Sequence, residues 1–79
     1  MAKMPRRNYR VNCPSHISPS RVWAFVEKIA EAYGFTVGVT SVGAGSISEL
    51  VFYVEEMPDS AHQTVLEECA RLGCTAHWE

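Results

Sequence analysis

The chain has 79 residues, of which 47% are hydrophobic and 20% charged, and its formal net charge is −2 at pH 7. This length corresponds to one small domain, and this apolar content excludes a chain that is disordered throughout. No apolar run approaches the roughly 18 residues of a membrane span, and no apolar segment follows the basic start, so we expect a cytoplasmic protein without a membrane segment.

Charge is distributed unevenly along the chain. The first ten residues carry no acid and four bases: Lys3, Arg6, Arg7 and Arg10. Residues 11–79 hold nine acids against three bases, a net charge of −6. Residues 1–7 have no hydrophobic period and contain a proline, so we expect a flexible basic tail before a single domain at 8–79. An acidic body favours a basic partner surface and disfavours direct binding of nucleic acid.

The first predicted elements are a strand at 9–13 and a helix at 19–33. Tyr9, Val11 and Cys13 alternate with polar residues in the strand. Ser18 is a suitable N-cap for the helix, and Pro19 fits its first position. Apolar side chains recur at helical spacing on one face: Val22, Phe25, Val26, Ile29 and Tyr33. Gly34 follows where a left-handed C-cap is expected.

A hairpin is predicted next, with strands at 35–42 and 47–56 and a glycine-rich turn at 43–46. In its first strand, Phe35, Val37 and Val39 share one face. In its second strand the alternation separates two sets of side chains: Leu50, Phe52 and Val54 inward, and Glu49, Val51, Tyr53 and Glu55 outward.

The last predicted elements are a second helix and a short strand. Pro58 ends the preceding strand because it cannot donate to the ladder. Ser60 and Gln63 have the capping-box spacing, and Asp59 suits a helix N-terminus. The apolar face of this helix follows: Ala61, Val65, Cys69 and Leu72. Gly73 ends the helix, and a strand is predicted at 74–78.

The order of elements is β-α-β-β-α-β, which resembles the ferredoxin-like fold. This α+β fold would place both helices on one face of a four-stranded antiparallel sheet. Right-handed crossovers would give the strand order fourth, first, third, second.

The cysteines and one histidine raise the question of a metal. The topology brings Cys13, Cys69 and Cys74 to one end of the sheet, with His16 in the adjacent loop. A Cys3His zinc site is therefore one alternative. A disulfide between Cys13 and Cys74 is another. The cysteines also fit the apolar faces, so buried free thiols are expected, with no metal and no cofactor.

No catalytic residue is predicted. The chain lacks the nucleophile-elbow and zinc-protease motifs. Glu55 and Glu56 point to opposite sides of a continuing strand, which disfavours a carboxylate pair. His62 and His77 have no evident partner in the sequence. We therefore expect a protein that is not an enzyme.

Three surfaces are candidates for binding a partner. The second strand lies at a sheet edge without charged residues, so Val37, Val39 and Thr40 are predicted to pair with a partner strand or with a second copy, unless a bulge at Gly38 blunts that edge. Trp23 beside Glu27 forms a second candidate. The third is a set of exposed acids: Glu55, Glu56, Glu67 and Glu68.

In size, acidity and element order the chain resembles small phage-encoded inhibitors of the anti-CRISPR class. This resemblance implies a stoichiometric inhibitor in the cytoplasm of a host cell, acting on a CRISPR effector complex or another nucleic-acid-binding complex with a basic surface. The alternative is a small ligand- or metal-binding ferredoxin-like regulatory domain.

Overall fold

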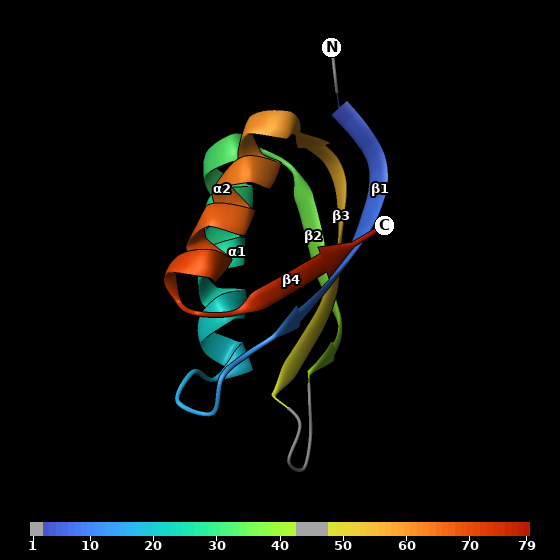
Figure 1. Cartoon of the computed structure of the whole chain (residues 1–79). Helices are drawn as coiled ribbons and strands as arrows, with labels where there is room; N and C mark the ends of the chain where they lie inside the picture. The colour runs from blue at the N-terminus through green and yellow to red at the C-terminus, as the bar shows by residue number, and fades with distance from the viewer. Residues whose placement is uncertain (1–2, 43–47) are drawn as a thin grey trace.

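The computed structural model describes residues 3–42 and 48–79 of the chain. It contains six elements in the predicted order: β1 (Lys3–Asn12), α1 (Pro19–Tyr33), β2 (Thr36–Val42), β3 (Glu49–Pro58), α2 (Asp59–Arg71) and β4 (Thr75–Trp78). The strands form one antiparallel sheet in the order β2-β3-β1-β4. Both helices lie on the same side of this sheet, and its other face is bare in the described part of the chain (Figure 1). The predicted ferredoxin-like α+β architecture and its strand order are therefore confirmed.

The core lies between the sheet and the two helices. Tyr9 and Val11 of β1 and Leu50, Phe52 and Val54 of β3 are at most 1% exposed. Tyr9 stands directly opposite Phe52 in the β1–β3 register, and the two rings stack at 4.9 Å between centroids. The apolar side chains that alternate in β1 and β3 therefore face the helices, as predicted, because successive side chains of a strand point to opposite faces of the sheet.

The first helix begins and ends as predicted. The Ser18 side chain accepts a hydrogen bond from the Ser20 backbone N–H, and Pro19 occupies the first turn. Gly34 is left-handed, with φ 77°, and its N–H donates to the Ala30 carbonyl. A side chain at Gly34 would strain this backbone conformation, so glycine is the residue that ends α1 here.

The basic segment is not a tail in its described part. Residues 3–7 belong to β1, which pairs with β3 from Lys3 opposite Pro58 to Asn12 opposite Glu49. The sequence-based prediction failed because the partner strand lies about fifty residues away and leaves no local periodicity. Pro5, which has no N–H to donate, stands opposite Glu56, where the backbone turns left-handed with φ 61°. The prediction for residues 1 and 2 lies outside the described residues.

Strand β2 lies at the sheet edge, as predicted, but its bulge is elsewhere. The β2–β3 register shifts by one residue between Val39 and Ser41, so Thr40 is the extra residue. Gly38 has another role: a Cβ atom there would lie 2.5 Å from the Tyr53 ring. Glycine therefore lets Tyr53 lie across the edge strand. Pairing of this edge with a second strand stays a prediction, and the glycine-rich turn at 43–46 lies outside the described residues.

The second helix starts earlier than the capping box predicts. Pro58 is the N-cap residue and offers no side-chain hydrogen bond, so Ser60 lies inside the helix, where its carbonyl accepts from the Thr64 hydroxyl. Met57, near the end of β3, is fully buried, and α2 follows β3 without a linker. Asp59 sits in the first turn, where its negative charge complements the helix dipole.

Two residues of the α1 face are more exposed than predicted. Phe25 is only half-buried, and Tyr33 is 42% exposed with its hydroxyl 3.1 Å from that of Thr64. The fully buried stripe is narrower, and it consists of Val22, Val26, Ile29 and Ala30. Trp23 is half-buried and meets Phe52 edge-on, at 6.0 Å between ring centroids.

The burial difference between two phenylalanines predicts different costs for their removal. Phe52→Ala should lower the free energy of unfolding by about 3–5 kcal/mol, because it empties the centre of the core. Phe25→Ala should cost clearly less, because part of its side chain already meets solvent. Urea denaturation of both variants checks this order, and equal losses would contradict the burial described here.

Candidate functional site

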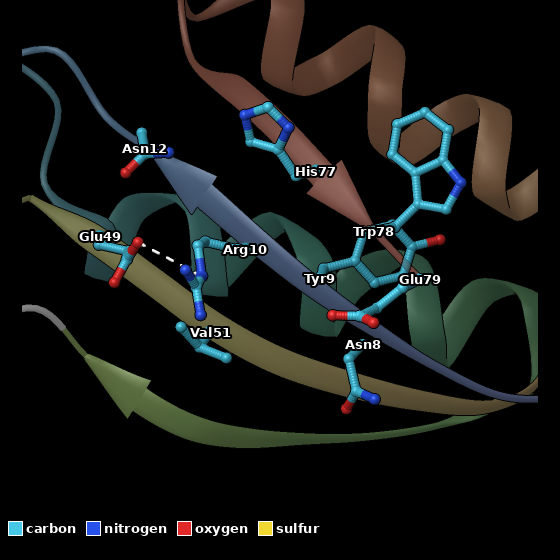
Figure 2. Close-up of a pocket in the computed structure, with 9 residues that line it drawn as sticks. All are labelled: Asn8, Tyr9, Arg10, Asn12, Glu49, Val51, His77, Trp78 and Glu79. Atoms are coloured by element: carbon cyan, nitrogen blue, oxygen red, sulfur yellow. Dashed lines mark ion pairs between the residues drawn. The ribbon is translucent and has the colours of Figure 1, made fainter.

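The bare face of the sheet carries a hollow of about 470 Å³. Three strands supply its lining: Asn8, Tyr9, Arg10 and Asn12 from β1, Glu49 and Val51 from β3, and His77, Trp78 and the following Glu79 from the β4 end. In Figure 2 the Arg10 and Glu49 side chains approach one another across two strands, while the Trp78 ring turns toward α2. The lining residues come together because β1 is the central strand between β3 and β4.

The hollow has an excess of negative charge. Two carboxylates, Glu49 and Glu79, line it against one guanidinium, Arg10. Arg10 Nε lies 3.5 Å from Glu49 Oε2, so this cation is already paired within the fold. Glu79 is exposed, and its backbone pairs with Asn8 through hydrogen bonds of 3.0 and 3.1 Å. The arrangement offers a carboxylate and several amide and imidazole groups to a ligand that carries positive charge.

A stacked group closes the other half of this sheet face. The Arg6 guanidinium lies 4.2 Å from the centre of the Tyr53 ring and 3.7 Å from the Glu55 carboxylate. The other side of the ring covers Gly38. Tyr53, which the alternation predicts to point outward, is therefore covered by contacts within the fold.

Two of the acids predicted to meet a partner are paired within the fold, and their binding to a partner stays a prediction. Glu55 pairs with Arg6 on the sheet face, and Glu68 pairs with Arg71 along α2. Glu27, Glu56 and Glu67 are exposed on three different elements. The residues of the hollow were missed because they occur singly on strands far apart in the sequence; the only available signal was their outward position in the alternation.

A polar cluster lies on the opposite, helix-facing side of β1. His62 of α2 is 7% exposed, and its Nδ1 lies 2.5 Å from the Tyr9 hydroxyl oxygen. Arg7 Nη1 lies 3.2 and 3.3 Å from the two imidazole nitrogens, and the Trp78 ring meets the imidazole edge-on at 4.9 Å. His62, which had no evident partner in the sequence, is thus held by three strand residues.

One assignment of protons satisfies this cluster. The Tyr9 hydroxyl has a single proton, which it donates to Met57 Sδ at 3.2 Å. His62 Nδ1–H then donates to the Tyr9 oxygen, and Nε2 accepts from Arg7. In this arrangement the imidazole is neutral. Burial lowers the pKa of His62, and the nearby Arg7 charge lowers it further. Burial also raises the pKa of Tyr9 to about 12. The groups form a structural chain of hydrogen bonds.

The three cysteines gather at one end of the sheet, as the topology predicted. One step beyond the pair Asn12–Thr75, the β1–β4 register sets Cys13 opposite Cys74. Counting from the hydrogen-bonded pair Asn8–Glu79, this is a non-hydrogen-bonded position, where opposed side chains come closest. Burial raises the pKa of the Cys13 thiol to about 11, with a further contribution from the nearby Cys74 thiol, and burial raises that of Cys69 to about 12.

Because burial raises their pKa values, the Cys13 and Cys69 thiols are protonated at neutral pH, whereas zinc binds thiolates. His16 is exposed in the loop after Cys13. Within residues 3–42 and 48–79, no group of three or more His, Cys, Asp or Glu side chains is arranged to hold a metal ion. In the same residues, no helix is long and apolar enough to cross a membrane.

No protein-family model and no curated protein matches the sequence. Solved structures do share its architecture. The C-terminal domain of the MgtC protein from Mycobacterium tuberculosis superposes with a TM-score of 0.76 at 15% identity, over 100% of this chain and 89% of that one. The de novo designed protein LFR1 1 with ferredoxin fold superposes with a TM-score of 0.50 at 10% identity, over 96% of this chain and 84% of that one. A putative amidohydrolase/peptidase from Burkholderia cenocepacia superposes with a TM-score of 0.60 at 19% identity, over 94% of this chain and 26% of that one. These identities show a common fold, and a fold by itself assigns no function.

The neutral state of His62 predicts a loss of stability in acid. Since burial lowers its pKa in the folded state, the unfolded chain takes up a proton first as the pH falls through its ordinary value of 6.5. The melting temperature should therefore fall below pH 6.5 by more than it does in His62→Gln. His77→Gln is the matched control, because His77 is exposed and should keep the wild-type pH dependence. Identical pH profiles for wild type and His62→Gln would refute this role.

The raised thiol pKa values predict slow alkylation of the native protein. A change from the ordinary value of 9.0 to about 11 leaves about 100-fold less thiolate at pH 8, so Cys13 should react with iodoacetamide about 100-fold more slowly than in urea.

Titration of freshly prepared denatured protein without reductant should find about three thiols, one for each cysteine. A count of one would indicate a Cys13–Cys74 disulfide, and stoichiometric zinc would overturn the free-thiol interpretation.

Proposed function

We propose that this ferredoxin-like domain is a non-enzymatic binding module that takes a positively charged segment of a partner protein into the hollow on the bare sheet face. The proposal rests on the excess of negative charge in that hollow, whose lining contains two carboxylates, Glu49 and Glu79, and a single guanidinium. Two asparagines and His77 add hydrogen-bonding groups around it. A Lys or Arg side chain fits this combination of an acid and several acceptors.

Two further features support a module that works by binding. Two of the strands that carry the hollow, β1 and β3, are backed by the most buried part of the core, so their lining residues are presented by rigid elements. Burial is the main cause of the shifted pKa values of His62, Cys13 and Cys69, and these groups lie against core partners. Their environments suit a structural role and do not activate a base or a nucleophile.

An arginine-rich peptide is a direct probe of this proposal. In an NMR titration of the labelled protein, the amide signals of Asn8–Asn12 and Thr75–Glu79 should move and saturate. Glu79→Gln should weaken binding several-fold, because it removes the carboxylate that has no cation partner among the described residues. Glu31→Gln is the control, since it removes an equal charge from an exposed site on α1. Equal weakening by both variants would mean that only net charge matters, and the hollow would lose its role.

The inhibitor hypothesis is a more specific form of the same proposal. A stoichiometric inhibitor of a nucleic-acid-binding complex, such as a CRISPR effector, would dock on a basic surface and exclude the nucleic acid. The test is target-DNA binding by a purified effector with increasing amounts of this protein. Inhibition that Glu49→Gln/Glu79→Gln abolishes would assign the contact to the hollow. Inhibition that responds only to charge reversal at Glu55/Glu56 or Glu67/Glu68 would assign it to the predicted acids, and absence of inhibition would remove this hypothesis.

A further inference from the structure

A second hollow lies between the two helices, on the other side of the molecule from the bare sheet face. Its volume is about 150 Å³, and its lining joins the first half of α1 to the end of α2: Arg21, Ala24, Phe25, Lys28, Arg71 and Leu72. Among residues 11–79 the sequence contains three basic side chains, and all three line this one site. No acid takes part in the lining.

The three cations are not neutralised to the same extent. Arg71 is bound by Glu68, which accepts from both its Nε and its Nη2. For Arg21 and Lys28, no carboxylate among the described residues lies within ion-pair distance. With Glu68 counted, the site keeps a net charge of about +2 in a molecule whose total charge is −2. The N-terminus of α1 and the C-terminus of α2 contribute dipoles of opposite sign, so the side chains decide the sign of the site.

The lining also has an apolar part. Phe25 and Leu72 are half-buried and line the hollow together with the three cations. This explains why Phe25, which the helical period places on the core face, remains partly open to solvent.

The size of the hollow restricts the ligand. A volume of about 150 Å³ is below the roughly 300–1,000 Å³ typical of sites that enclose a drug-sized molecule. A hollow of this size suits one compact anionic group. A phosphate group carries up to two negative charges on several oxygens, and guanidinium forks match its geometry.

We propose that this inter-helix hollow binds a phosphate group, either of a free phosphomonoester or inorganic phosphate or of a lipid headgroup. Arg21 and Lys28 supply the free cations, and Arg71, oriented by Glu68, supplies a third. The proposal is independent of the sheet-face hollow, which has the opposite charge and lies on other elements.

The test is an NMR titration with inorganic phosphate, with sodium chloride as the control at equal ionic strength. Saturable shifts are expected for amides in 21–28 and 69–73. Arg21→Gln and Lys28→Gln should each weaken binding about tenfold, the effect of losing one charge-assisted contact. Both residues are exposed, so the variants should fold. Arg6→Gln removes an arginine from the sheet face, outside the sheet-face hollow, and should bind phosphate as wild type does.

A second arm separates the two sources of phosphate. Cosedimentation with phosphatidylcholine vesicles containing phosphatidic acid is compared for wild type and Arg21→Gln/Lys28→Gln. Saturable binding of free phosphate without vesicle binding assigns a small soluble ligand, and vesicle binding that the double variant loses assigns a lipid headgroup. Shifts that do not saturate, equal effects of Arg21→Gln and Arg6→Gln, or the absence of both kinds of binding would overturn the proposal.

Discussion

The stacked rings of Tyr9 and Phe52 join the two central strands, and the packing of the other elements depends on this pair. The rings are 4.9 Å apart and nearly parallel, at an interplanar angle of 7°. Trp23 of α1 meets Phe52 edge-on, His62 of α2 contacts Tyr9, and Trp78 of β4 meets His62. A continuous series of aromatic contacts thus links both helices to three strands. Aromatic contacts of this kind add to the hydrophobic burial and fix mutual orientation.

The side chains of β1 fall into two groups, one on each face of the sheet. Residues that face the helices enter the buried cluster, where Arg7 and His62 share hydrogen bonds. Residues that face outward, Arg6 and Arg10, pair with Glu55 and Glu49 of β3. The basic segment and part of the acidic body therefore neutralise one another across the central strands. The charge that remains is local: negative in the hollow on the sheet, positive in the hollow between the helices.

Much of the fold could be predicted from the sequence because its information is local. Alternation in β3, the helical period of α1 and the caps at Ser18 and Gly34 each lie within a few residues. The errors concern features decided at a distance. Residues 3–7 become a strand only because β3 is long enough to pair with them, and Ser60 loses its capping role because Met57 is drawn into the core. The two hollows are lined by residues from separate elements, so no sequence motif indicates either of them.

The central position of β1 has a consequence for how the chain reaches this structure. Strand β1 is synthesised before both of its partners: Asn12 pairs with Glu49, Lys3 with Pro58 and Tyr9 with Trp78. Contacts of such sequence separation close large loops before any compensating burial is gained, which slows folding. Until β3 and β4 have emerged from the ribosome, both edges of β1 stay unpaired. The nascent segment is rich in arginine there, and like-charge repulsion between neighbouring copies of Lys3–Arg10 would oppose premature association of these strands during translation.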